Sequence, residues 1–142
     1  MARNGKKLWM PRILVVEDSF SMRSFVRTTL ESEAAGLSGV EVVEATSGFD
    51  ALRLLPRGPY DLVITDINMP DINGLELISF IRKSEQHRST PILIISTQGS
   101  ERDRERGMGL GANGYITKPF TPELLLQEAL KQLRSRADKP HG

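Results

Sequence analysis

Polar side chains follow four short apolar runs of the chain, at the positions where each run ends. Apolar runs rich in β-branched residues and bounded by polar or turn residues predict strands buried on both faces of a parallel sheet. The polar residues are Glu17 and Asp18 after 13–16, Asp66 after 62–65, Ser96 after 92–95, and Lys118 after 115–117. Because ligands bind at the carboxyl ends of the strands in an open parallel sheet, we expect these side chains to converge on one crevice.

The three carboxylates of this set, Glu17, Asp18 and Asp66, predict a cation site. Carboxylates that lie close together repel one another and raise one another's pKa unless a cation joins them. Mg²⁺ suits such a site because it takes hard oxygen ligands and retains several waters. A single carboxylate after a strand commonly caps the next helix. Three of them beside one lysine favour the metal interpretation.

Lys118 and Ser96 supply further groups for phosphoryl transfer to a carboxylate. Pro119 follows Lys118 in a tight turn before a helix, a setting in which a cis peptide bond is found. A fixed ammonium holds a transferred phosphoryl oxygen, and a hydroxyl can move toward it. A nucleotide-phosphate loop would place hydroxyls and glycines after the first strand, whereas this chain has two carboxylates there.

Strands and helices alternate along the chain, and hydrophobic periodicity places them. The spacing predicts strands at 12–16, 40–43, 61–65, 92–95 and 114–117. It predicts helices near 22–30, 47–55, 75–87, 99–110 and 122–133. The last helix has Thr121 as its cap and Pro122 in its first position, and it should fray from Arg134 onward.

This alternation predicts a single α/β domain. Right-handed crossovers give a doubly wound five-stranded parallel sheet with five helices on its two faces. We expect a flexible N-terminal extension at 1–10, the domain at 11–134 and a polar tail at 135–142. No second domain fits in the remaining length.

The composition excludes several classes of protein. The chain has 142 residues, no cysteine and a net charge of +1, so a nucleic-acid-binding surface and disulfide chemistry are not expected. No apolar run approaches the length of a membrane-spanning helix, and no signal peptide is recognised. We therefore expect a cytoplasmic protein without membrane contact.

Several sequence fragments together resemble the receiver domain of bacterial response regulators, the CheY-like domains of two-component signalling. The resemblance covers roughly 11–134, and its fragments are Val15–Asp18, Asp66–Pro70, Gly74–Leu77, Gly111–Tyr115 and Lys118–Phe120. Each fragment is weak alone, but their order and spacing are specific. The resemblance implies a flavodoxin-like sheet with strand order 2-1-3-4-5.

The resemblance also assigns roles to residues. It implies that Asp66 is the phosphoacceptor and that Lys118 pairs with the phosphoryl group. Asp18, Asp66 and the backbone carbonyl of Asn68 would hold Mg²⁺, with Glu17 acting through a metal-bound water. Ser96 and Tyr115 would form the switch that responds to phosphorylation, although Tyr115 also reads as a half-buried aromatic residue in an edge strand.

The resemblance implies a stand-alone response regulator that assists its own phosphorylation and is not an enzyme. Its phosphodonor would be a sensor histidine kinase. Its output would be a protein target bound by the fourth helix, fifth strand and fifth helix. The segment Asp18–Arg23 is similar to chemotaxis regulators and suggests a role in motility.

Three alternatives stay open. A phosphorelay intermediate is the nearest alternative, and a degenerate receiver that binds proteins without phosphorylation is the second. An aspartyl phosphatase ranks last, because that class needs a carboxylate at position 68 and Asn68 cannot serve as one.

Some positions depart from the family pattern or compete with the assigned ones. Asp71 repeats the pattern of Asp66, but it follows Pro70 in a predicted exposed turn. Thr97 is larger than the usual residue and would hinder small phosphodonors. Gln98 occupies a position that tunes dephosphorylation in the family, as does Asn68. The charged helix near 99–110 should be the most mobile element.

Overall fold

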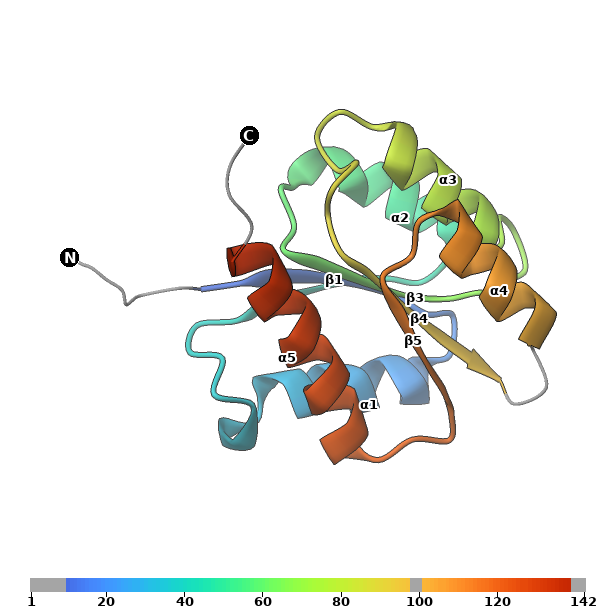
Figure 1. The fold of residues 1–142 in the computed structure, drawn as a ribbon. Coiled ribbons are helices and arrows are strands. Elements are labelled where there is room, and N and C mark those ends of the chain that lie inside the picture. Colours follow the sequence, from blue (N-terminus) through green and yellow to red (C-terminus); the bar gives the residue numbers. More distant parts are fainter. Residues whose placement is uncertain (1–9, 98–100, 139–142) are drawn as a thin grey trace.

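The computed structural model describes residues 10–97 and 101–138, in which five parallel strands form one sheet (Figure 1). The strand order β2-β1-β3-β4-β5 confirms the predicted topology. The strands are β1 (Arg12–Val16), β2 (Glu41–Ala45), β3 (Leu62–Asp66), β4 (Ile92–Thr97) and β5 (Gly114–Lys118). The helices are α1 (Phe20–Glu31), α2 (Gly48–Leu54), α3 (Gly74–Lys83), α4 (Glu101–Leu110) and α5 (Pro122–Asp138), with 3₁₀ turns at Glu33–Ala35 and Leu55–Arg57.

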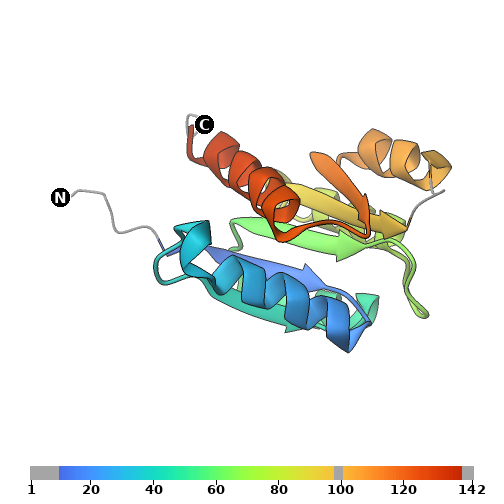
Figure 2. The same cartoon turned by 90° about the horizontal axis from the view of Figure 1, so that it is seen from below.

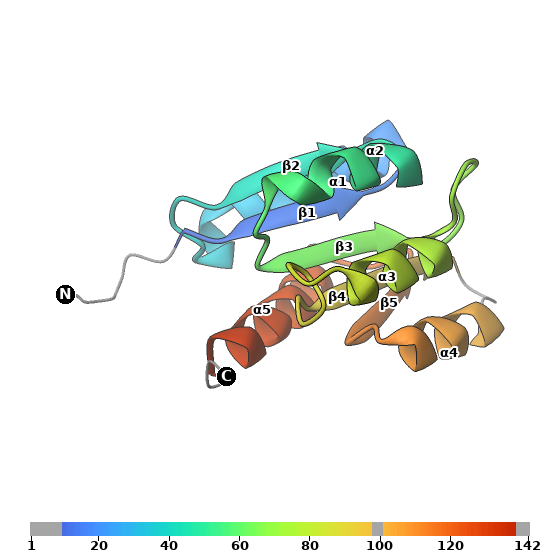
Figure 3. The ribbon, with the colours of Figure 1, turned by 90° about the horizontal axis from the view of Figure 1, so that it is seen from above.

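Helices cover both faces of the sheet. The helices α1 and α5 lie on one face, and α2, α3 and α4 lie on the other (Figures 2 and 3). Residues of β1, β3 and β4 alternate between the two resulting cores, one containing Ile13, Val15, Leu62, Ile64, Leu93 and Ile95, the other Leu14, Val16, Val63, Ile92 and Ile94. Burial on both sides explains the continuous apolar runs of these strands.

Four strands run further than predicted, and the extensions of β4 and β5 bear on the site. The strand β4 continues to Thr97 and β5 to Lys118, because the ladder between them pairs Ser96 with Thr117 and Thr97 with Lys118. The prediction ended these two strands just before Ser96 and Lys118, whereas backbone pairing continues regardless of side-chain polarity. Ser96 and Lys118 are therefore held by the sheet itself.

The last helix also differs from its prediction. It runs to Asp138 and does not end near Arg134, since its final residues include good helix formers. No helix among the described residues combines the length and apolar character that a bilayer crossing requires. Most of the predicted 1–10 extension, and Gln98, lie outside the described residues.

Gly107 allows α4 to pack closely on the sheet. A Cβ at this position would overlap the Cδ1 atom of Ile94, which is fully buried in β4. Gly109, two residues later on the same helix, has open space around its Cα. The two glycines have the same helix propensity, so only their surroundings distinguish them. That α4 is the most mobile element stays a prediction.

Gly109→Ala should raise the free energy of unfolding by about 0.5–1 kcal/mol, because it lowers the entropy of the unfolded chain without a clash. Gly107→Ala should lose this gain and lower stability by roughly 1 kcal/mol, because the buried Ile94 must move. Urea unfolding of both variants checks this difference. Equal stabilisation by the two alanines would contradict the packing argument.

Asp71 caps the start of α2. Its Oδ1 accepts a hydrogen bond from the amide of Gly48 at 3.1 Å, and its Oδ2 accepts one from the amide of Phe49 at 2.9 Å. These amides have no acceptor within the helix. The hydrogen bonds from Phe49 and Gly48 lower the pKa of Asp71 from 3.8 to about 2. Asp71 therefore caps α2, and it lies in an exposed turn, as predicted from the sequence.

Asp71→Asn should lower the melting temperature at neutral pH by a few degrees, because the amide accepts these hydrogen bonds less strongly. A lowered pKa gives stability that is present above 3.8 and lost as the pH falls through about 2. The difference between variant and wild type should therefore shrink across that range. Thermal unfolding at several pH values measures it, with Glu105→Gln as a control on the exposed face of α4. A constant difference across the range would contradict the capping role.

Candidate functional site

Three carboxylates converge at the carboxyl end of the sheet, as the sequence predicted. Oxygen atoms of Glu17, Asp18 and Asp66 all lie within 4.8 Å of one another. The strands β1 and β3 are neighbours, with Val16 opposite Thr65, so the residues that follow them begin side by side. Glu17 and Asp66 are buried, while Asp18 is exposed at the mouth of the site.

Lys118 brings an ammonium to the two buried carboxylates. Its Nζ atom lies 2.7 Å from Oε1 of Glu17 and 3.4 Å from Oδ2 of Asp66. The lysine ends β5, two strands away from β3, and reaches the site across the end of β4. The peptide bond between Lys118 and Pro119 is cis, as expected for this turn.

The backbone after β3 fixes one oxygen of Asp66. Its Oδ1 accepts hydrogen bonds from the amide of Ile67 at 2.7 Å and from that of Asn68 at 3.4 Å. Gly74 packs directly on this segment: its amide donates to the carbonyl of Ile67 at 2.8 Å, and a Cβ there would overlap the carbonyl oxygen of Asp66. Only Oδ2 of Asp66 therefore faces Lys118.

The electrostatics of the site leave its carboxylates short of positive charge. Burial raises the pKa of Glu17 and that of Asp66 above their ordinary values, against hydrogen bonds and charges that lower them. Burial lowers the pKa of Lys118, but the hydrogen bond to Glu17 and the charge of Asp66 outweigh it, so the net direction is upward. One ammonium thus contacts two buried carboxylates, and the exposed carboxylate of Asp18 lies close to both of them.

The donor set fits Mg²⁺. Its three side chains all offer carboxylate oxygens, which are the hard ligands that Mg²⁺ takes, and the exposed Asp18 leaves room for the waters that Mg²⁺ retains. Asn68 follows Asp66 closely enough for its amide to contact that carboxylate. A divalent cation here would supply the charge that Lys118 alone does not.

Ser96 and Tyr115 lie on the face of the sheet covered by α3 and α4. Ser96 is buried and follows Ile95, the residue of β4 that pairs with Asp66. Tyr115 pairs with Ile94 and is half-buried, as predicted for an edge strand. Its hydroxyl accepts a hydrogen bond from Arg104 of α4, whose guanidinium carbon lies 4.2 Å from the centre of the tyrosine ring.

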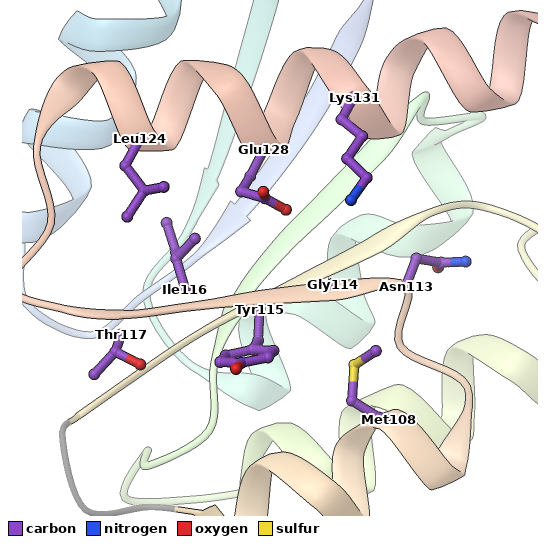
Figure 4. A pocket seen from close by; sticks show the side chains of 9 residues that line it. All are labelled: Met108, Asn113, Gly114, Tyr115, Ile116, Thr117, Leu124, Glu128 and Lys131. Carbon is purple, nitrogen blue, oxygen red and sulfur yellow. The ribbon is translucent and has the colours of Figure 1, made fainter.

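An open groove lies beside Tyr115, between α4 and α5 (Figure 4). Its volume is about 540 Å³. The side chains that line it combine an apolar floor with one acid and one base; its lining residues are Met108, Asn113, Gly114, Tyr115, Ile116, Thr117, Leu124, Glu128 and Lys131. Apart from Asn113 in the loop before β5, these residues come from the three elements that were expected from the sequence to bind a target.

The glycines at 109, 111 and 114 have the spacing G-x-G-x-x-G, but their context differs from a dinucleotide-binding loop. That fingerprint follows a strand and opens a helix. Here the segment leaves α4 and enters β5, at the opposite end of the strand from the carboxylates. It therefore provides no phosphate-binding helix start.

Sequence reasoning missed two arginines that contact the site residues. From the sequence, Arg104 belongs only to the charged helix near 99–110, and Arg23 belongs only to the segment that is similar to chemotaxis regulators. Arg104 contacts Tyr115, and Arg23 donates a hydrogen bond to the backbone carbonyl of Glu17 at 2.8 Å. The sequence pattern around these arginines does not predict either contact, because both depend on how a helix packs against a strand.

Comparison with known proteins agrees with this geometry. The sequence profile described as "Response regulator receiver domain" matches residues 13–130. The chain is 36% identical over 118 residues to a chemotaxis protein CheY homolog of Campylobacter jejuni, covering 82% of this chain and 88% of that protein. It is 36% identical to chemotaxis protein CheY1 of Helicobacter pylori, again over 82% of this chain and 92% of that protein.

A solved structure agrees as well. The chemotaxis response regulator CheY4 of Vibrio cholerae superposes with a TM-score of 0.76 at 36% identity, covering 88% of this chain and 99% of that one. Sequence, fold and the arrangement of the acidic crevice thus agree, and the chain belongs to the response regulator receiver domain family of two-component signalling.

Proposed function

We propose that the chain accepts a phosphoryl group on Asp66 from a sensor histidine kinase, with Mg²⁺ bound by Asp18, Asp66 and the carbonyl of Asn68. The observation that carries this proposal is the environment of Asp66. Its Oδ1 is held by backbone amides, while its Oδ2 faces Lys118 at 3.4 Å. The acceptor is therefore oriented with one oxygen left for reaction.

The chemistry follows from these positions. Oδ2 of Asp66 attacks phosphorus in line, the new O–P bond forms as the donor P–N bond breaks, and the donor imidazole leaves with the electron pair. Lys118 neutralises charge on the phosphoryl oxygens. Bound Mg²⁺ would add further neutralisation and orient the same oxygens. Glu17 accepts a hydrogen bond from Lys118 at 2.7 Å, and it would contact the metal through a bound water.

Phosphorylation of Asp66 would then bias the switch. Added negative charge draws the hydroxyl of Ser96 toward the phosphoryl group, and Tyr115 responds on the same face of the sheet. The output would be altered binding of a protein target at the groove between α4 and α5.

The relatives favour a role in motility, since the two similar sequences and the solved structure named above all carry chemotaxis names. Kinase-driven signalling of this kind would place the protein in the cytoplasm, with no nucleic-acid or membrane contact. Asn68 is an amide where an aspartyl phosphatase needs an acid, which disfavours that alternative.

Incubation with acetyl phosphate and Mg²⁺ should add one phosphoryl group to the wild-type chain, seen by intact mass. Asp66→Asn should abolish the adduct, because it removes the nucleophile, and EDTA should suppress it. The matched control is Asp71→Asn, which removes the second aspartate of the repeated pattern and should keep the adduct.

Loss of the adduct in Asp71→Asn, with retention in Asp66→Asn, would overturn the assignment. If the wild type forms no adduct, the exposed Thr97 at the end of β4 would explain exclusion of a small donor, and a histidine kinase would be tried next. Failure with both donors would favour a binding module that works without phosphorylation.

Asp66→Asn should raise the melting temperature of metal-free protein by a few degrees near pH 8, because it removes a poorly neutralised buried charge. Folding raises the pKa of Asp66 above 3.8, so protonation of this carboxyl stabilises the folded state below pH 3.8. This stability is lost as the pH rises through the raised pKa of the folded protein. The gain in melting temperature from Asp66→Asn should therefore grow with pH. Saturating Mg²⁺ should stabilise the wild type and have a smaller effect on the variant.

Thermal unfolding in EDTA and in Mg²⁺, between about pH 4 and pH 8, measures these effects. Glu105→Gln serves as the control for a general change in net charge. A metal-free Asp66→Asn protein that is less stable than wild type at high pH would contradict the charge imbalance described for the site.

A further inference from the structure

We propose, resting on the proposed function, that Arg23 is a positioning residue for the Mg²⁺ site because it fixes the peptide that joins Glu17 to Asp18. Its guanidinium donates to the carbonyl oxygen of Glu17 at 2.8 Å. A second guanidinium nitrogen, Nε, lies 3.1 Å from Oε1 of Glu44. The side chain is only 11% exposed, so water competes weakly for these contacts.

The peptide held by Arg23 lies between two others that are held by different partners. The amide of Glu17 donates to the carbonyl of Ala45 at 3.1 Å, which continues the pairing of β1 with β2. The amide of Ser19 donates to the carboxylate of Glu17 at 2.9 Å. Because a peptide unit is planar, rotation of the middle one would move the backbone on both sides and redirect two carboxylates at once.

Glu44 anchors Arg23 from the neighbouring strand. It lies on β2 opposite Val15 of β1, and a hydrogen bond from Arg27 lowers its pKa, which keeps it ionised. Arg23 itself is placed by the first turn of α1, where its amide donates to the carbonyl of Ser19 at 2.9 Å. The Arg23 side chain therefore extends from α1, past the Glu17–Asp18 peptide, to Glu44 on β2, and both of its ends are fixed.

A purely structural role makes a different prediction. If Arg23 only ties α1 to β2 through Glu44, its loss lowers stability and leaves Mg²⁺ affinity unchanged. If its positive charge dominates, its loss tightens Mg²⁺ binding, because like charges near the site repel. Weaker Mg²⁺ binding follows only from disturbance of the Glu17–Asp18 peptide.

The experiment compares Arg23→Met and Arg23→Lys with Arg27→Met in the full chain. Arg27 is on the same helix and pairs with the same Glu44, but its other partner is Glu31 and not the Glu17–Asp18 peptide. Arg23→Lys keeps the charge and loses the two-nitrogen fork that reaches both partners. Mg²⁺ affinity is measured by amide chemical shifts during titration with Mg²⁺, and stability by thermal unfolding in EDTA.

Both Arg23 variants should bind Mg²⁺ about tenfold more weakly, the lower end of the range for groups that orient metal ligands. Arg27→Met should bind Mg²⁺ as the wild type does, even where its loss of stability is similar. Unchanged or tighter Mg²⁺ binding by both folded Arg23 variants would overturn the inference. A wild type that binds no Mg²⁺ would instead overturn the proposed metal site on which the inference rests.

Discussion

A single ammonium, that of Lys118, lies between the buried carboxylates of Glu17 and Asp66 and partly neutralises both. Two carboxylates taken out of water at this separation repel each other strongly, and one lysine does not balance them and the nearby Asp18. This imbalance makes the crevice receptive to a divalent cation. A phosphoryl group transferred to Asp66, as proposed, would add further negative charge to this crevice.

The sheet holds these charges in place, because each one lies at the carboxyl end of a paired strand. The strands β1 and β3 are buried on both faces and pair directly, which fixes Glu17 and Asp66 relative to each other. The extension of β5 to Lys118 adds the lysine to the same rigid frame. A site built on paired strands is held more accurately than one built on loops alone.

The path from the site to the surface is short. Ser96 is one residue beyond the strand position that pairs with Asp66, and Tyr115 lies on the same face of the neighbouring strand. Tyr115 in turn contacts Arg104 of α4 and lines the groove beside α5. Adjacent residues of two paired strands thus lie between the acidic crevice and the groove.

The strand order was implied only by the resemblance to receiver domains. The sequence by itself determined the class of fold and the convergence of Glu17, Asp18, Asp66 and Lys118. It could do so because apolar runs identify buried strands, and parallel strands bring their carboxyl ends to one edge. Only the tertiary structure decided the contacts of Arg23 and Arg104 and the oxygen of Asp66 that faces Lys118. Those depend on the packing of helices against strands and on side-chain direction, which residue spacing does not encode.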